Sequence, residues 1–588
     1  MNSRELRQKY LNFFVKRGHK IIPSSPLVPE NDATTLFVSS GMQPLVPYLM
    51  GEPHPLGKKL VDIQLCFRGQ GIASDDTLEV GNTRHTTFFE MEGNWSLGSY
   101  FKEEQLNYFF TFLTDSVEGL GLDPRRLYVT VFAGDKTVSK DKESILIWQK
   151  LFAQKGINAK EGKRIFAYGV DKNWWSRLGT PDQMPQGEIG GPDSEVFYDF
   201  GPSHQPKFDP KCHPDWDCGR FLEIGNSVFM QYQKQADGSL KELKQKSVDF
   251  GGGLVRQLAA TRDDPDIFKT DIYAGVIKVI EEITDKSYQE EKNRVPMRIV
   301  ADHVTAASFL VKNGVIPANK GQGYVLRRLI RRALVKIRQL QVDAGEGELE
   351  KIVAKVLTSY DGVYFDKEKE NRRIGGEIGN EAVKFNKVLV KGLRELERLG
   401  TINGRKAFDL YQSYGFPWEL TAELAREKGQ KITHQEFKKE FKKHQELSRS
   451  ASISMFRGGL QDQNQTTIKY HTATHLVQAA LRAVLGEHIK QEGSNITTSR
   501  ARFDFSHPRK LEEKEIKQVE KWVNQKIKEN WPVSFEIRDK DEAVKEGATA
   551  FFRRNIPSGP RFIKLAVFRQ SCALGRTLPL QEKLGWLK

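Results

Sequence analysis

The spacing of apolar residues divides the chain into a front part of mixed helix and strand and a longer helical part. The first apolar residues share one face of a predicted helix, at Leu6, Tyr10, Phe13 and Phe14. From about residue 255 to 450, periodic apolar positions alternate with dense charge, as in residues 324–342 and 382–399. Further on, residues 501–505 alternate as a strand does. At 588 residues the chain is long enough for several domains.

Composition marks the domain boundaries. Residues 448–465 are rich in Ser, Gln, Asn and Gly and lack a clear period, which predicts a linker. We therefore expect a mixed domain over residues 1–250, a helical domain over residues 251–447 and a third domain over residues 466–588.

The chain is basic, because 91 Lys and Arg residues against 76 Asp and Glu residues give a net charge of +15. Such an excess indicates a polyanionic partner, RNA or DNA first, with a merely soluble basic surface as the alternative. Four scattered cysteines do not make a disulfide scaffold, and no signal segment or apolar run of membrane-spanning length occurs. We expect a soluble, cytoplasmic protein with no membrane partner.

The residue spacing argues against two common nucleotide-binding motifs. Residues 51–58 superficially suggest a phosphate loop, but five residues separate the glycines, and Lys59 stands where Ser or Thr would coordinate magnesium. No G-x-G-x-x-G pattern follows a predicted strand, which argues against a Rossmann enzyme.

Two distant segments together predict a site for a bent nucleoside triphosphate on an antiparallel sheet. In the first, Arg68 leaves a strand, a polar loop follows, and an aromatic strand returns through Phe88 and Phe89. The second, residues 248–256, is a glycine-rich turn that ends in Arg256. Glycines let the backbone approach the ligand, and the arginines offer planar forks to phosphate oxygens.

These segments resemble motifs 2 and 3 of the class II aminoacyl-tRNA synthetases, and residues 85–91, His-Thr-Thr-Phe-Phe-Glu-Met, narrow the resemblance to the alanine members. The match covers nearly the whole chain. It implies an α+β protein, in which an antiparallel catalytic sheet precedes a helical tRNA-recognition domain and a smaller, truncated editing domain. It also implies ATP, Mg²⁺, L-alanine and tRNA(Ala) as ligands. The family's β-barrel and C-terminal dimerisation segment have no counterpart here, so we expect a monomer.

The resemblance implies roles residue by residue. Catalysis would involve Arg68, Arg256 and Asp249. ATP would contact Arg68, Phe88, Phe89, Glu90, Gly251, Gly253 and Arg256. Alanine would be bound by Trp175, Val228, Asp249 and Gly251, with Asp249 on the ammonium group and Val228 against the methyl group. The family carries Glu before the last arginine of motif 3, where this chain has Val255, and we expect this change to alter the orientation of Arg256.

Arginines form two i,i+4 rows on one predicted helix, which pair Arg327 with Arg331 and Arg328 with Arg332. Like charges at this spacing destabilise an isolated helix by about 0.2–0.5 kcal/mol per pair. An anionic partner is therefore expected; RNA is our preferred interpretation, and pairing with acidic residues of another helix is the alternative. By resemblance, Asn319 and Gln412 would read the G:U pair of the tRNA acceptor stem, although the family has an acidic residue at position 412.

A second predicted helix carries His471 and His475, which places two imidazoles on one face as a Zn²⁺ pair requires. Alanine is difficult to distinguish from serine and glycine in one pocket, so a second, hydrolytic site is expected. By resemblance Cys572 would be a third zinc ligand, but Arg576 stands where the family has a histidine. Another possible metal cluster, of spacing unlike standard zinc modules, is formed by His204, Cys212, His213 and Cys218.

The final twenty or so residues have the properties expected of an out-of-frame segment. Permitted codons for residues 570–577, read from the third base, encode Glu-Leu-Cys-Ser-Gly-Pro-His. The same offset over residues 581–587 encodes Arg-Glu-Ile-Gly-Leu-Val, and both strings match the tail of the family. A degenerate tail with accidental resemblance is the alternative.

Two rival functions stay open. An inactive RNA-binding paralogue is suggested by Val255 and Gln412. A lone editing hydrolase is opposed by the intact segments around Arg68 and Asp249.

Overall fold

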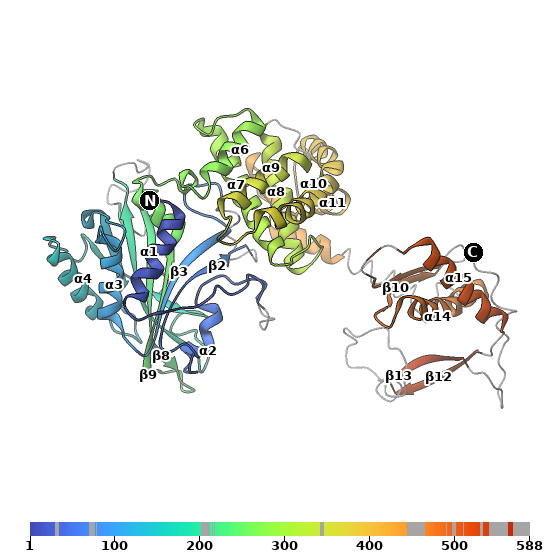
Figure 1. Ribbon diagram of the computed structural model, residues 1–588, viewed down its shortest axis with the longest axis horizontal. Coiled ribbons are helices and arrows are strands. Elements are labelled where there is room, and N and C mark those ends of the chain that lie inside the picture. The colour runs from blue at the N-terminus through green and yellow to red at the C-terminus, as the bar shows by residue number, and fades with distance from the viewer. Residues whose placement is uncertain are drawn as a thin grey trace. The chain divides into compact units, whose positions relative to one another are not determined.

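The computed structural model describes residues 1–29, 35–69, 77, 79–201, 212–214, 216, 218–340, 346–443, 465–489, 491–496, 501–507, 509, 511–529, 533–539 and 562–568. The chain forms two compact units, one of residues 1–402 and 409–432, the other of residues 403–408 and 433–588 (Figure 1). Within the described ranges, no helix is both long and apolar enough to cross a membrane.

The front of the first unit is built on a nine-stranded sheet of order β1-β2-β3-β9-β8-β7-β4-β5, with β6 paired to β7. Only the pairs β1–β2 and β4–β5 are parallel, so the predicted antiparallel sheet holds for the strands that carry the nucleotide motifs. The strands are β1 (Lys20–Ile21), β2 (Lys59–Phe67), β3 (Phe88–Leu97), β4 (Leu127–Phe132), β5 (Ile165–Tyr168), β6 (Trp174–Ser176), β7 (Ile189–Asp199), β8 (Phe221–Lys234) and β9 (Leu240–Gly253).

Strand register brings the predicted motifs together at the centre of the sheet. Trp95 of β3 lies opposite Asp249 of β9, which in turn lies opposite Val228 of β8. In the next row Gly93 lies opposite Gly251. Because directly opposed residues share a face of a sheet, these positions form one continuous surface.

Helices cover the other face of the sheet. The ring of Phe250 on β9 contacts Tyr10 of α1 and Phe109 of α3, with centroids 6.4 and 4.4 Å apart. The predicted apolar stripe of α1 is buried, and a capping box formed by Asn2 and Glu5 begins this helix. The helices of this part are α1 (Ser3–Val15), α2 (Val46–Leu49), α3 (Lys102–Thr114), α4 (Lys142–Gln154) and α5 (Leu254–Thr261).

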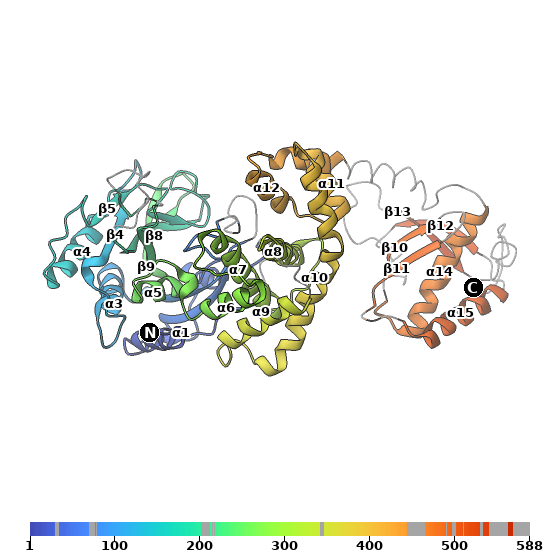
Figure 2. The ribbon, with the colours of Figure 1, turned by 90° about the horizontal axis from the view of Figure 1, so that it is seen from above.

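The helical layer predicted from residue 255 onward packs directly on the sheet. Phe88 of β3 stacks on Phe309 of α7, with ring centroids 3.9 Å apart. Within the layer, α8 packs on α7 and α10 (Figure 2). The helices are α6 (Ala274–Thr284), α7 (Glu291–Lys312), α8 (Gly321–Gln339), α9 (Glu346–Ser359), α10 (Lys367–Arg398), α11 (Gly404–Tyr414) and α12 (Trp418–Glu427).

The second unit contains the predicted histidine-bearing helix, α14 (Gln465–Leu485), which packs on α15 (Glu513–Lys528) through Leu476, Ala480, Val523 and Ile527. The strand predicted over residues 501–505 is confirmed as β11 (Ala501–Phe505), which pairs with β10 (Gln491–Ile496). A second antiparallel pair is formed by β12 (Val533–Asp539) and β13 (Phe562–Phe568). The predicted linker, apart from Gln465, and the predicted out-of-frame tail lie outside the described residues.

Candidate active site

Arg68 stands where β2 ends and is exposed. Its backbone N–H donates to the carbonyl of Thr87 at 2.7 Å, and its Nε donates to the carbonyl of Ser39 at 3.1 Å. The guanidinium lies 5.0 Å from the ring centroid of Phe89 on β3. Among the described residues, its two terminal nitrogens have no hydrogen-bond partner, so they are available to a ligand.

Arg256 is held in the first turn of α5 by a carboxylate from another strand. Its Nη1 donates to the Glu223 carboxylate at 3.0 Å and to the Glu223 carbonyl at 3.3 Å. Val255, at the position where the family has Glu, is 7% exposed and packs in the interior. Glu223 on β8 therefore orients Arg256. This carboxylate, 33 positions earlier in the chain, takes the place of the one that the family has at position 255.

Arg84 extends this positive cluster beside His85, and sequence reasoning missed the contribution of Arg84. Burial and the nearby Arg256 lower the pKa of Arg84, whose Nη1 donates to the carbonyl of Phe221 at 3.3 Å. Burial, followed by the charges of Arg256, Arg84 and Arg68, lowers the pKa of His85 to about 4. His85 is thus neutral at pH 7. Because Arg68 and Arg256 both act on His85, these two predicted arginines lie near one another. The available signal was the position of Arg84 directly before the motif that starts at His85.

The two phenylalanines of β3 have different environments. Phe88 is 1% exposed and belongs to the core through its stacking on Phe309. Phe89 is half-buried and lies beside Arg68. Of the two phenylalanines predicted to contact ATP, only Phe89 is open to a ligand, and burial of Phe88 corrects the prediction for that residue.

Glu90 is also an interior residue. Both of its carboxylate oxygens accept hydrogen bonds from Arg7 of α1 at 2.6 Å, and Oε1 also accepts from the Tyr364 hydroxyl at 2.6 Å. The residue is 4% exposed. The carboxylate therefore ties α1 and the helical layer to β3, which corrects the prediction that Glu90 contacts ATP.

Asp249 of β9 is half-buried and accepts a hydrogen bond from Trp95 Nε1 at 2.6 Å. Burial raises the pKa of Asp249 to about 7, against the opposing effect of the indole donor. An adjacent cation would favour the charged carboxylate. The carboxylate is therefore suited to an ammonium group.

Apolar side chains surround this carboxylate. Val228, directly opposite Asp249, packs in one cluster with Trp95, and the half-buried Trp175 of β6 packs against the same cluster. Val228, Trp95 and Trp175 thus give an apolar surface on the sheet face that carries Asp249.

Glycine is required in the neighbouring row for steric reasons. A Cβ atom at Gly93 would overlap the indole of Trp95, and one at Gly251 would lie 3.0 Å from Met91 Sδ. Gly253 has a similar constraint, because its Cβ would lie 3.2 Å from Cδ of Arg256. The glycines thus keep the indole, the thioether and the guanidinium close to the sheet surface.

Asn319 and Gln412 are both exposed, and both segments are tied to α8. Asn319 Oδ1 accepts a hydrogen bond from Arg327, and Arg331 donates to the carbonyl of Gly415, just after α11. Arg327 and Arg331 also share the carboxylate of Glu381 on α10. The two predicted stem-reading positions are therefore anchored to one helix.

Arg328 and Arg332 correct the predicted RNA contact, because each is only 4% exposed. Arg328 Nη1 donates to Glu419 at 3.1 Å, and Arg332 forms a two-point pair with Glu423 at 2.6 and 3.0 Å. Burial alone would raise the pKa of Glu423, but Arg332 and Lys336 outweigh it and lower this pKa to about 2. The alternative of acidic partners on another helix is the correct one for these two residues.

Neither predicted metal centre has a complete ligand set in the described part of the chain. His471 and His475 lie one turn apart on α14, as predicted, but Cys572 lies outside the described residues. The thiols of Cys212 and Cys218 are 2.8 Å apart, and His213 Nδ1 is hydrogen-bonded to the Tyr168 hydroxyl. His204 also lies outside the described residues, which contain no group of three or more His, Cys, Asp and Glu side chains suited to a metal.

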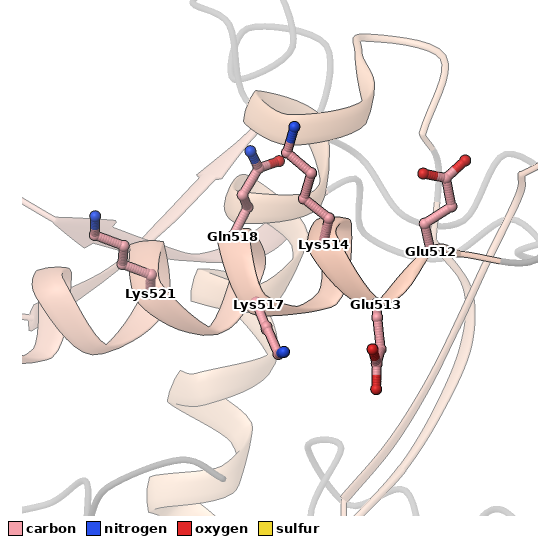
Figure 3. Close-up of a pocket in the computed structure, with 6 residues that line it drawn as sticks. All are labelled: Glu512, Glu513, Lys514, Lys517, Gln518 and Lys521. Atoms are coloured by element: carbon pink, nitrogen blue, oxygen red, sulfur yellow. The ribbon is translucent and has the colours of Figure 1, made fainter.

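The second unit has a shallow depression along α15 (Figure 3). Its lining is entirely charged or polar and consists of Glu512, Glu513, Lys514, Lys517, Gln518 and Lys521. Opposite charges line it together, and no predicted site residue belongs to it, so it is a solvated helix face.

Comparisons with known proteins agree with this geometry. The family model described as tRNA synthetases class II (A) matches residues 5–498. The chain is 44% identical over 600 residues to the alanine–tRNA ligase of Treponema denticola, which covers 99% of this chain and 95% of that protein. It is 42% identical over 597 residues to that of Treponema pallidum, covering 99% and 94%. It is 42% identical over 561 residues to that of Borrelia hermsii, covering 93% and 90%.

Proposed function

The chain belongs to the class II tRNA synthetase (A) family, and we propose on that premise that it attaches L-alanine to tRNA(Ala) with the use of ATP. The observation that carries the alanine specificity is the Asp249–Trp95 pair beside Val228. Its carboxylate would bind the substrate ammonium group, and the apolar surface beside it would contact the methyl group. L-Alanine and tRNA(Ala) are the substrates that follow.

The cluster of Arg68, Arg84 and Arg256 supports the activation step. The carboxylate of alanine must attack the α-phosphorus of ATP, and both reactants are anions. Catalysis is therefore a matter of alignment and charge neutralisation rather than of a protein nucleophile. We assign phosphate contacts to the free guanidinium nitrogens of Arg68 and Arg256, and adenine stacking to Phe89.

Mg²⁺ would enter with the nucleotide, because this ion is commonly held by substrate phosphates and few protein groups. Bound in this way, the ion would neutralise phosphate charge. Orientation would still come from Arg68, Arg256 and Asp249.

Transfer requires the acceptor end of the tRNA. We assign recognition of the stem to Asn319 and Gln412, both exposed and anchored to α8 through neighbouring contacts. We assign activation to residues 1–250, stem recognition to residues 251–447 and editing to residues 466–588, with a monomeric chain acting in the cytoplasm.

Alanine-dependent exchange of pyrophosphate into ATP tests the proposal. The wild-type protein should catalyse exchange with alanine and more slowly with serine or glycine, because the pocket distinguishes small side chains incompletely. An inactive RNA-binding paralogue would give no exchange with any amino acid, and a lone editing hydrolase would give none either.

Editing is proposed as impaired. Two histidines on α14 and one thiol leave a zinc tetrahedron incomplete, with Arg576 in the place of the fourth ligand. Purified protein should contain less than one zinc per chain and fail to hydrolyse Ser-tRNA(Ala). Resequencing the gene decides whether the tail is out of frame, because an in-frame tail with a histidine ligand would predict full zinc content.

A further inference from the structure

The connection from β2 to β3 spans residues 68–87, and α8 holds two of its described residues, Gly69 and Thr77. Arg328 Nη2 donates to the carbonyl of Gly69 at 2.7 Å and to Thr77 Oγ1 at 3.3 Å. Arg332 Nη1, one turn further along α8, donates to the carbonyl of Thr77 at 2.6 Å. Gly69 directly follows Arg68, so the anchor lies one residue from a proposed phosphate contact.

The two arginines are themselves held rigidly. Arg328 Nη1 pairs with Glu419, and Arg332 Nε and Nη2 pair with Glu423, one turn further along α12. Tyr324 donates its hydroxyl proton to the second oxygen of Glu419 at 3.2 Å. A planar fork that is paired on one edge presents its other edge in a fixed direction.

A second chain of hydrogen bonds leads from Arg332 to the backbone of Arg68. Arg332 Nη1 donates to His303 Nε2 at 2.9 Å, so Nδ1 carries the imidazole proton and donates it to Asp302 at 2.8 Å. Burial lowers the pKa of His303, in agreement with a neutral ring. Asp302 accepts from both N and Oγ1 of Thr87, whose carbonyl accepts the N–H of Arg68.

We propose that Arg328 and Arg332 are positioning residues for adenylate formation, because they hold Gly69 and Thr77 of the β2–β3 connection and thereby direct the guanidinium of Arg68. This inference rests on the proposed function. It replaces the predicted RNA contact of these arginines with a role in the ATP site. It also makes α8 a bridge, because Arg327 and Arg331 on the same helix hold the segments assigned to stem recognition.

The test is alanine-dependent exchange measured with ATP and alanine varied separately. In Arg328→Lys, the ammonium keeps the charge opposite Glu419 but has no fork to reach Gly69 and Thr77 together. Arg328→Gln removes the charge as well. Both variants should raise the KM for ATP about tenfold, since a small displacement of a charge-stabilising group is costly, while the KM for alanine changes less than twofold.

Lys336→Gln is the matched control. Lys336 lies one turn beyond Arg332 and is 3% exposed at its side chain. It pairs with Glu423 and Glu427, and in the described part of the chain no hydrogen bond joins it to Gly69 or Thr77. It should lose thermal stability with an unchanged KM for ATP. The inference is overturned if both Arg328 variants keep the wild-type KM, or if Lys336→Gln raises it equally. A wild-type protein without exchange would instead refute the proposed function.

Discussion

The two arginines proposed to contact ATP and the buried arginines of α8 differ in how their guanidinium groups are paired. Arg68 and Arg256 each keep guanidinium nitrogens without partners among the described residues, and they lie near enough to lower the pKa of His85. Arg328 and Arg332 are buried and paired with carboxylates. Guanidinium nitrogens left open at one site and buried pairing with carboxylates at the other indicate a ligand site and a structural contact between helices, respectively.

The balance on α8 follows a simple periodic rule. Its basic row at 328, 332 and 336 faces an acidic row at 419, 423 and 427, and every pair is separated by 91 residues. A constant separation means that α8 and α12 run in the same direction with i,i+4 rows in register. The acidic row was visible in the sequence, but its partner was not.

The largest effect is expected from removing an ion pair between α8 and α12. Arg332→Ala leaves the buried Glu423 without its two-point partner and should lower the free energy of unfolding by about 3 kcal/mol, as is typical when one member of a buried pair is removed. Chemical denaturation of wild type and variant measures it. Unchanged unfolding would mean that Arg332 is solvated, and the RNA-contact interpretation would return.

Arg68→Ala should act on chemistry instead of stability. The loss of a donor that stabilises developing charge should slow adenylate formation by about 10². Its exposed side chain makes few interior contacts, so the unfolding midpoint should stay near that of wild type. Arg262→Ala, an exposed arginine just after α5, is the control and should exchange normally. A wild-type rate for Arg68→Ala at saturating ATP would remove Arg68 from the site.

The proposed role of Asp249 also predicts that the KM for alanine depends on pH. The pKa of Asp249 is about 7, so the carboxylate becomes protonated as the pH falls through that value. The KM for alanine should rise about tenfold per pH unit below 7 and stay constant above it, because the ammonium group needs the charged form. Exchange kinetics between pH 5.5 and 8.5 measure this, and a KM constant from pH 6 to 8 would contradict the assignment.

The smallest effect is expected at the stem-reading surface. Asn319→Ala should reduce the preference for a G:U over a G:C stem by about fivefold, since one hydrogen-bonding contact is worth roughly 1 kcal/mol. Charging of both stem variants under identical salt conditions measures it. Equal losses on both stems would assign Asn319 to general affinity rather than to recognition.

The local pattern predicted much of the fold. The stripe on α1, the alternation of β11 and the pair of histidines on α14 follow from periods of 3.6 and 2, which depend on nearby residues alone. The glycine-rich end of β9 was likewise recognisable, because close approach of a side chain or ligand requires the missing Cβ. Nothing in the described structure tests the predicted linker, the tail or Cys572.

Tertiary structure decided which face of the sheet each side chain occupies and which residue it pairs with. Phe88 and Phe89 are adjacent and chemically identical, yet strand alternation and the position of Phe309 place one in the core and leave the other beside Arg68. Glu223 and the acidic row of α12 neutralise arginines that lie 33 and 91 residues away. The sequence by itself determined the elements and the motif residues of this protein, because those depend on short-range spacing. Tertiary structure alone decided which arginines keep donors open to a ligand and which are buried in ion pairs, because these pairings depend on neighbours brought together through space.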